Sequence, residues 1–226
     1  MANRLLALLP TDSRAHLMSK LTRVPLRVPQ ILIRANEPAD AAYFPETGWI
    51  SVVINLSDGR SAEVGLVGRE GVVGTARGWI ATADHMVQGN GEALRIEIAA
   101  LENELTQNEG LRLILEVYAQ AVHVQTAHIA ACNGWHDLQS RFARWLLLAR
   151  DRADSDELPL TQEFLAMMLC VHRPRITVIA GILQTAGIIT YNRGHITIRN
   201  REALEATACE CYGIIHEQFE QVFHRK

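Results

Sequence analysis

The sequence lacks the features that define several classes of protein. It has only four cysteines in 226 residues, which is too few for a disulfide framework in a chain of this length. No apolar run approaches the length of a membrane span, and the opening MANRLLALLP has one Arg and too short an apolar run for a signal peptide. We therefore expect a cytoplasmic protein that has no disulfides and does not bind a membrane.

Motifs of catalysis are also missing. The sequence contains no nucleophile elbow, no P-loop and no H-E-x-x-H pair, and its acidic residues are dispersed. His136 and Asp137 stand alone at a predicted break between helices, where a helix cap is a better explanation than a catalytic dyad. We therefore do not expect an enzyme.

The cysteines and histidines do not predict a metal site. Cys209 and Cys211 are two residues apart in a helix predicted over residues 201–223, where they would point to opposite sides. Two pairs could be imagined as ligands: Cys132 with His136, and Cys170 with His172. Small buried thiols and solvated imidazoles explain these pairs more simply. We expect neither a metal ion nor another cofactor.

Acidic residues are absent from one stretch near the C-terminus. Between His172 and Arg201 the chain has five arginines and no Asp or Glu, whereas its overall net charge is −3. The five are Arg173, Arg175, Arg193, Arg199 and Arg201. A concentrated positive charge of this kind favours a polyanion, and we expect double-stranded DNA as the partner.

The same part of the chain predicts a winged helix-turn-helix. Thr161 is suited to cap a first helix. A second helix begins near His172 with Pro174 in its first turn, where a missing N–H is harmless, and it ends at Ala186-Gly187. The predicted wing has strands over residues 188–191 and 195–198, joined by a turn at residues 192–194.

Residues 24 to 98 have a different texture. Short runs of Val, Ile and Leu are separated by Pro and Gly at close spacing, which is typical of an antiparallel, jelly-roll-like β-roll. Within it, WISVVINL and SAEVGLV flank an Asp-Gly turn and predict a hairpin. We therefore expect an α+β chain in which a β-roll precedes the winged helix.

A long helix is predicted to begin near Glu109. Its apolar positions step alternately by four and three residues, which is typical of a helix that pairs with a copy of itself. These positions are Leu111, Leu115, Tyr118, Val122, Gln125, Ile129 and Cys132. The alternative is that this face packs on its own domain. Asn133 and Gly134 predict the end of the helix and Asp137 the cap of the next one, so we expect a hinge at these three residues.

In this order of elements, the chain resembles the CRP/FNR family of bacterial transcription regulators. The resemblance covers residues 12 to 200 and is strongest in TQEFLAMML, ITVIAGILQTAGII and YNRGHITI. It implies a cyclic-nucleotide-binding-like sensor over residues 1–108, a dimerisation helix and hinge over 109–136, and a DNA-binding domain over 137–226. It also implies that Arg173 reads a guanine and that His172 contacts phosphate. The expected DNA-contacting residues are Gln162, His172, Arg173, Arg175, Thr177, Val178, Arg193 and His195.

Three positions of the DNA-binding domain depart from the family pattern. Pro174 stands where the family often has a base-reading Glu, and Val178 can touch only an apolar group such as a thymine methyl. The operator should therefore differ from the best-known family site. Cys170 occupies the turn position that usually holds Gly, where a positive φ costs about 1 kcal/mol for other residues.

The predicted sensor also departs from the family's nucleotide-binding members. Their phosphate cassette has a Gly-Glu pair and a later Arg-Ser or Arg-Thr pair, whereas here Gly74 precedes Thr75 and the later pair is Asp84-His85 or His85-Met86. An Asp at the arginine position would repel a phosphate, so we expect no cyclic nucleotide. No cysteine cluster of the iron–sulfur branch precedes Cys132. The possible haem ligands, His85, His123 and His128, have no distinguishing spacing, and the effector is not assigned.

Our leading hypothesis is a homodimeric regulator that binds an inverted-repeat operator and, if it is an activator, contacts RNA polymerase. The alternative is a ligand-binding regulatory module whose winged helix serves protein contacts. The arginines without neighbouring acids favour DNA.

Overall fold

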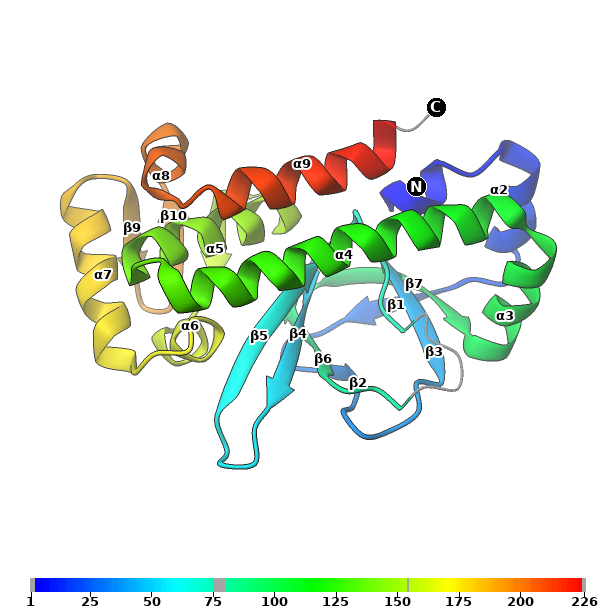
Figure 1. Cartoon of the computed structure of the whole chain (residues 1–226), viewed down its shortest axis with the longest axis horizontal. Helices are drawn as coiled ribbons and strands as arrows, with labels where there is room; N and C mark the ends of the chain where they lie inside the picture. The colour runs from blue at the N-terminus through cyan, green and yellow to red at the C-terminus, as the bar shows by residue number, and fades with distance from the viewer. Residues whose placement is uncertain (1–2, 75–79, 154, 225–226) are drawn as a thin grey trace.

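The computed structural model describes residues 3–74, 80–153 and 155–224, and it has the predicted α+β architecture. A two-sheet β domain is followed by a long helix and then by a helical domain with a small sheet (Figure 1). Two short helices, α1 (Arg4–Ala7) and α2 (Thr11–Met18), precede the first strand.

The β domain consists of two antiparallel sheets, with the strand orders β1-β7-β3 and β2-β6-β4-β5. The strands are β1 (Thr22–Leu26), β2 (Ile31–Ile33), β3 (Ala41–Pro45), β4 (Trp49–Asn55), β5 (Ser61–Val67), β6 (Asp84–Gly89) and β7 (Gly91–Glu97). Apolar side chains of both sheets, among them Leu26, Ile50 and Val87, form one buried cluster. The predicted β-roll is confirmed.

Strands β4 and β5 form the hairpin that the Asp-Gly turn predicts. They pair from Ile50 opposite Val67 to Asn55 opposite Ser61. Gly59 has a φ of 84° in the turn, a conformation that is accessible to glycine at little cost.

Helix α4 (Glu109–Trp135) lies along the β domain and follows the shorter helix α3 (Ile98–Gln107) (Figure 1). Asn108 caps it by accepting a hydrogen bond from the Leu111 backbone N–H at 3.0 Å. The last helix, α9 (Cys211–His224), packs along α4 and runs in the opposite direction (Figure 1).

The stripe predicted to pair with a second copy packs on its own chain instead. Six of its seven residues are buried within the single chain: Leu111, Leu115, Tyr118, Gln125, Ile129 and Cys132. Tyr118 donates to the Val72 carbonyl at 3.1 Å, and its ring lies 6.1 Å from that of Phe219 on α9. The dimerisation assignment of these residues, with half-buried Val122, is therefore corrected: regular spacing marks an apolar face but does not say what covers it.

The predicted end of α4 is displaced by about two residues, to Trp135. Asn133 and Gly134 lie inside α4, because a single glycine costs only about 1 kcal/mol in a helix and tertiary contacts can offset it. One such contact is the Asn133 side-chain oxygen, which accepts from Arg141 at 2.9 Å. The chain turns at His136, and Asp137 then caps α5 (Leu138–Ala153) by accepting from the backbone of Gln139 and Ser140.

The C-terminal domain contains the predicted winged helix-turn-helix. Its elements are β8 (Glu157–Pro159), α6 (Gln162–Met168), α7 (Arg173–Thr185), β9 (Ile189–Asn192) and β10 (His195–Ile198), with the sheet order β8-β10-β9. Strand β8 was not predicted from the sequence, because its only buried residue is Leu158 and a single apolar position shows no alternation.

The C-terminal segment forms two helices rather than the single one predicted. α8 (Arg201–Thr207) ends before Ala208, and α9 begins at Cys211. Because the chain breaks between α8 and α9, Cys209 and Cys211 are not held on opposite sides of one helix. The prediction that they cannot point to a common site was therefore wrong.

Among the described residues, no single helix is long and apolar enough to cross a membrane. Only α6 with α7 passes as a pair on length and composition, and that pair is bent by 103°.

Buried polar contacts from α5 join the two domains. Trp145 Nε1 donates to Glu63 Oε1 at 2.7 Å, and Ser51 Oγ donates to Glu63 Oε2 at 2.7 Å. Arg152 Nε lies 2.8 Å from Glu70 Oε1. These groups are all buried, so directional contacts fix the helix-turn-helix domain against β4 and β5.

This contact predicts a pH-dependent stability. Burial raises the pKa of Glu63 to about 7, although hydrogen bonds from Ser51 and Trp145 oppose the shift. A carboxyl with a raised pKa stabilises the fold fully below its unfolded pKa, and that stabilisation is lost as the pH rises through about 7. The free energy of unfolding should therefore fall between about pH 5 and about pH 8.

Glu63→Gln should flatten this dependence and raise the free energy of unfolding at about pH 8 by on the order of 1–3 kcal/mol, measured by urea denaturation. Glu217→Gln on the exposed face of α9 is the matched control and should keep the wild-type profile. An unchanged profile in Glu63→Gln would contradict the assignment.

Candidate nucleic-acid interface

Helix α7 presents one apolar and one polar face. Ile176, Ala180 and Leu183 are buried against the domain. The outward residues include Arg173, Arg175, Thr177 and Val178, and the Val178 side chain is 59% exposed. His172 stands at the N-cap and Pro174 in the first turn, as predicted.

The turn between α6 and α7 has the backbone conformation expected for the family's glycine. Cys170 has a φ of 55°, and the backbone N–H of Val171 still reaches the Ala166 carbonyl at 2.9 Å. The turn therefore keeps its geometry, and the exposed Cys170 bears the strain of the left-handed conformation.

The exposed end of α7 is organised by α6. Gln162 Oε1 accepts from Thr177 Oγ1 at 3.0 Å and from Arg173 Nε at 3.3 Å. Arg173 Nε also lies 3.0 Å from Glu163 Oε1. Both partners of this ion pair are well exposed, so it contributes little stability and leaves Arg173 free to change partner.

The wing carries a second group of cationic side chains. Arg193 has a φ of 46° and Gly194 a φ of 82°, which makes a tight turn with Arg193 at its tip. Arg193, His195 and Arg199 line one shallow hollow with Glu157. Arg199 belongs to the positive charge predicted from the sequence, and the pairing of β9 with β10 places it beside the wing.

The five arginines do not remain equally available. Arg201 pairs with Asp151 at 2.9 Å and with Glu205 at 2.7 Å, so its positive charge is already paired with carboxylates of its own domain. In the described part of the chain, Arg175, Arg193 and Arg199 have no ion pair with a carboxylate. The free positive charge therefore lies at the start of α7 and on the wing.

The hairpin tip of the β domain approaches the start of α7. Arg60 and Ser61, in the turn and at the start of β5, line a groove of about 500 Å³ together with Cys170, His172 and Arg175. The tip of the β4–β5 hairpin and the start of α7 therefore border one groove. The sequence carries no sign of this arrangement, which brings together residues more than one hundred positions apart.

A cavity of about 390 Å³ lies between the β domain and α4. Its lining is mostly apolar and includes Val52, Val73 and Leu115, with His85 as the one ionisable imidazole. Burial lowers the pKa of His85 to about 4, so the imidazole is neutral at pH 7, and its Nδ1 has no hydrogen-bond partner among the described residues. His85, one of the three possible haem ligands named from the sequence, therefore lines a cavity.

Asp84 does not stand in this cavity, which corrects the reason given for excluding a phosphate. Its carboxylate accepts instead from the Ala35 backbone N–H and from Asn55 Nδ2, both at 2.7 Å. Thr75, the other departure named from the sequence, lies outside the described residues. Among the described residues, no Lys or Arg lines the cavity.

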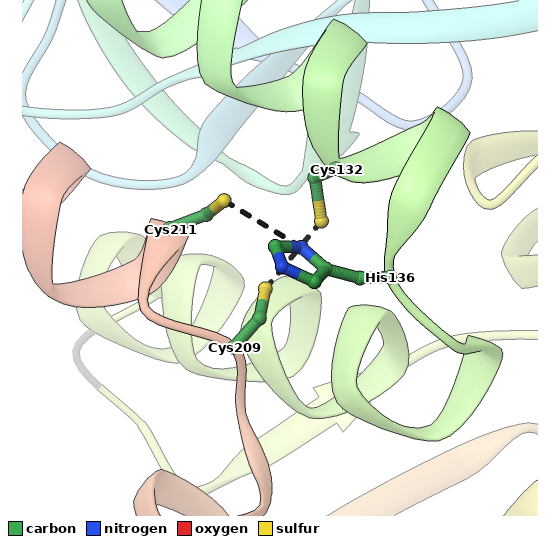
Figure 2. Close-up of side chains that lie close together, drawn as sticks. All are labelled: Cys132, His136, Cys209 and Cys211. Carbon is green, nitrogen blue, oxygen red and sulfur yellow. Dashed lines mark hydrogen bonds between the residues drawn. The ribbon is translucent and has the colours of Figure 1, made fainter.

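One further cluster brings together residues that were weighed separately. Cys132 and His136 at the end of α4 meet Cys209 and Cys211 at the break before α9 (Figure 2). Hydrogen bonding with Cys209 lowers the pKa of the Cys132 thiol, and the positive charge of Arg144 acts in the same direction. The pair Cys170 and His172 is not part of the cluster.

Comparison with known proteins agrees with this geometry. Residues 23–108 match the family model of the cyclic nucleotide-binding domain, and residues 140–207 match that of the Crp-like helix-turn-helix domain. A search of curated protein sequences found no match.

Among solved structures, FixK2 from Bradyrhizobium japonicum superposes with a TM-score of 0.73 at 19% identity, over 84% of this chain and 98% of FixK2. The c-di-GMP responsive global regulator CLP from Xanthomonas campestris gives 0.67 at 16% identity, over 84% and 99% of the two chains. TTHB099, a CRP-family transcriptional regulator from Thermus thermophilus, gives 0.65 at 21% identity, over 83% and 96%. At these identities the likeness shows the fold.

The two domains are matched in the order that the fold displays, and the helix-turn-helix supports binding to DNA. The chain belongs to the CRP/FNR family of transcription regulators.

Proposed function

We propose that this regulator binds an inverted-repeat operator as a homodimer, with α7 in the major groove and the wing on the flanking phosphates. The observation that carries the proposal is the position of the free arginines, which lie at the exposed start of α7 and on the wing. Two copies related by a two-fold axis would present two such helices about one helical turn of DNA apart.

The contacts divide by what each side chain can reach. Arg173 can exchange its exposed carboxylate partner for the O6 and N7 of a guanine, and Gln162 holds it and Thr177 at the start of the helix. Val178 offers an apolar surface to a thymine methyl. Ile182, which was not among the residues predicted from the sequence, is 46% exposed and extends this surface. Arg175, Arg193 and His195 serve phosphates, with His172 at the N-cap.

Dimerisation should use the outer face of α4, because the inner face is already buried. This outer stripe also steps by four and three residues: Leu113, Val117, Gln120, Val124, Ala127, Ala131 and Gly134. None of these residues is fully buried, and Leu113 is 51% exposed. Trp135, which is 90% exposed, extends the apolar surface at the end of the helix. A second copy of α4 would cover these groups in a coiled-coil-like contact.

The effector of this regulator should not be cyclic AMP. The cavity beside α4 offers a cyclic phosphate no cation among the described residues, and the neutral His85 does not supply one. Desolvating an unpaired phosphate against an apolar wall is unfavourable. Saturable binding of cyclic AMP in a calorimetric titration would contradict this reading.

Arg173→Ala should weaken binding to the preferred operator by about 1–3 kcal/mol and relax specificity at one base pair of each half-site. Arg193→Ala should weaken binding to all sequences about equally and reduce the salt dependence of binding. Fluorescence anisotropy with the operator, single-base variants and unrelated DNA at several salt concentrations separates the two effects.

Arg27→Ala, at an exposed position of the β domain, is the control and should bind as wild type. Equal loss of specific and non-specific binding in Arg173→Ala would overturn its role as a base reader.

Charges on the outer stripe should split the dimer. Leu113→Glu and Ala131→Glu would each bring two carboxylates together in the proposed contact and should yield monomers by light scattering at micromolar concentration. Ala130→Glu is a matched control on the same helix, about 100° around it from Ala131, and should remain dimeric. A monomeric wild type, or dimeric charge variants, would refute the assignment of this face.

A further inference from the structure

Three thiols and one imidazole converge where α4 ends against the segment between α8 and α9. Cys132 Sγ lies 3.4 Å from Cys209 Sγ, and Cys211 Sγ lies 3.8 Å from His136 Nδ1. The four atoms all lie within 4.8 Å of one another, and the side chains point toward a common centre (Figure 2). The three cysteines are buried and form a small cluster of their own.

These separations suit the ligands of a single tetrahedral ion. Zinc binds thiolates at about 2.3 Å and imidazoles at about 2.0–2.1 Å, which places neighbouring ligand atoms about 3.5–3.8 Å apart in a tetrahedron. An iron–sulfur cluster spreads its ligands over separate irons and needs a wider opening. The donor set of three cysteines and one histidine is one that structural zinc sites use.

The second ring nitrogen of the histidine is already oriented. His136 Nε2 lies 3.2 Å from Glu210 Oε1, and Glu210 stands between the two C-terminal cysteines. With Nε2 donating to this carboxylate, Nδ1 is the unprotonated nitrogen that faces the thiols. Metal-bound histidines commonly have such a carboxylate partner.

A buried arginine with unsatisfied donors lies beside the cluster. The Arg144 side chain is 2% exposed, and its Nε and Nη1 have no hydrogen-bond partner among the described residues. Its charge acts on the thiols of Cys132 and Cys209. Three thiolates on a divalent cation carry one net negative charge, which Arg144 would balance.

A disulfide between Cys132 and Cys209 explains less of this arrangement. It would use two of the four ligands and leave the convergence of Cys211 and the oriented His136 without a reason. A disulfide is neutral, so it would add no negative charge beside Arg144.

We propose that Cys132, His136, Cys209 and Cys211 bind one Zn²⁺ ion in a closed structural site. The ion would fasten the end of α4 to the segment from which α9 returns along it. All four positions are filled by protein, so the site holds structure rather than activating a water molecule.

The test uses the full chain purified under reducing conditions without a polyhistidine tag. Elemental analysis should find about one zinc per chain after dialysis. Removal of the zinc by a strong chelator should lower the melting temperature, and added Zn²⁺ should restore it. Replacement by Co²⁺ should give the visible bands of a tetrahedral site with thiolate ligands.

Variants distinguish ligands from neighbours. Cys209→Ser should lose zinc on dialysis, whereas Cys170→Ser, at the one cysteine outside the cluster, should keep it. His136→Cys should still bind Co²⁺ and show stronger thiolate-to-cobalt absorption, which keeps the test valid where Cys209→Ser does not fold. Glu210→Ala should weaken zinc binding about 10-fold or more, and the exposed Glu217→Ala should not.

The proposal fails if the reduced wild-type chain neither contains zinc nor takes up Zn²⁺ or Co²⁺. It also fails if Cys170→Ser loses the ion as readily as Cys209→Ser, or if the chain yields iron with sulfide. A Cys132–Cys209 disulfide that persists in place of the metal would favour the redox alternative. Each result is independent of DNA binding, so the proposed operator contacts are tested separately.

Discussion

The arrangement of this molecule depends on the burial of α5 between its two domains. Residues 141–149 of this helix are all buried, although they include Arg141 and Arg144. Where the surface of a helix is covered on every side, its polar groups are stabilised mainly by partners within the protein. Trp145 therefore bonds to Glu63 of the β domain, and the Arg141 guanidinium donates to the Leu169 carbonyl beside the helix-turn-helix turn.

These contacts tie the position of the recognition helix to that of the sheet. Glu63 lies on β5, the strand of the hairpin whose tip lines the groove with His172 and Arg175. Strand β5 also contacts α6, the helix that precedes α7. The cavity beside α4 is bounded by Val67 of the same strand, which gives a bound effector a short physical route to the interface.

Much of the fold could be predicted from the sequence because its signals are local. The Asp-Gly turn, the Thr161 cap, Pro174 in the first turn of α7 and the spacing around it each determine a structure within a few residues. The positive φ of Cys170 followed from its place in the turn. The family resemblance and the α+β fold, which were predicted from these signals, are confirmed. The individual DNA-contacting residues remain predictions.

What could not be predicted depends on contacts between distant segments. The spacing of the α4 stripe identified a buried face. The elements that cover this face are α9 and the β domain, and the sequence of α4 alone does not determine them. No proline or glycine marks the break at Ala208, so the sequence did not predict it. The proximity of Cys209 and Cys211 to Cys132 and His136 could therefore not be predicted either. The groove between the hairpin and α7 was hidden for the same reason.

The central claim is that two copies of α7 read an inverted repeat. It is tested most directly by selecting bound DNA from a random pool with the purified full-length protein at physiological salt. We expect enriched sequences that are inverted repeats, with half-site centres about one helical turn apart and a guanine at a fixed position of each half. Enrichment of sequences without two-fold symmetry, or no enrichment above the starting pool, would contradict it.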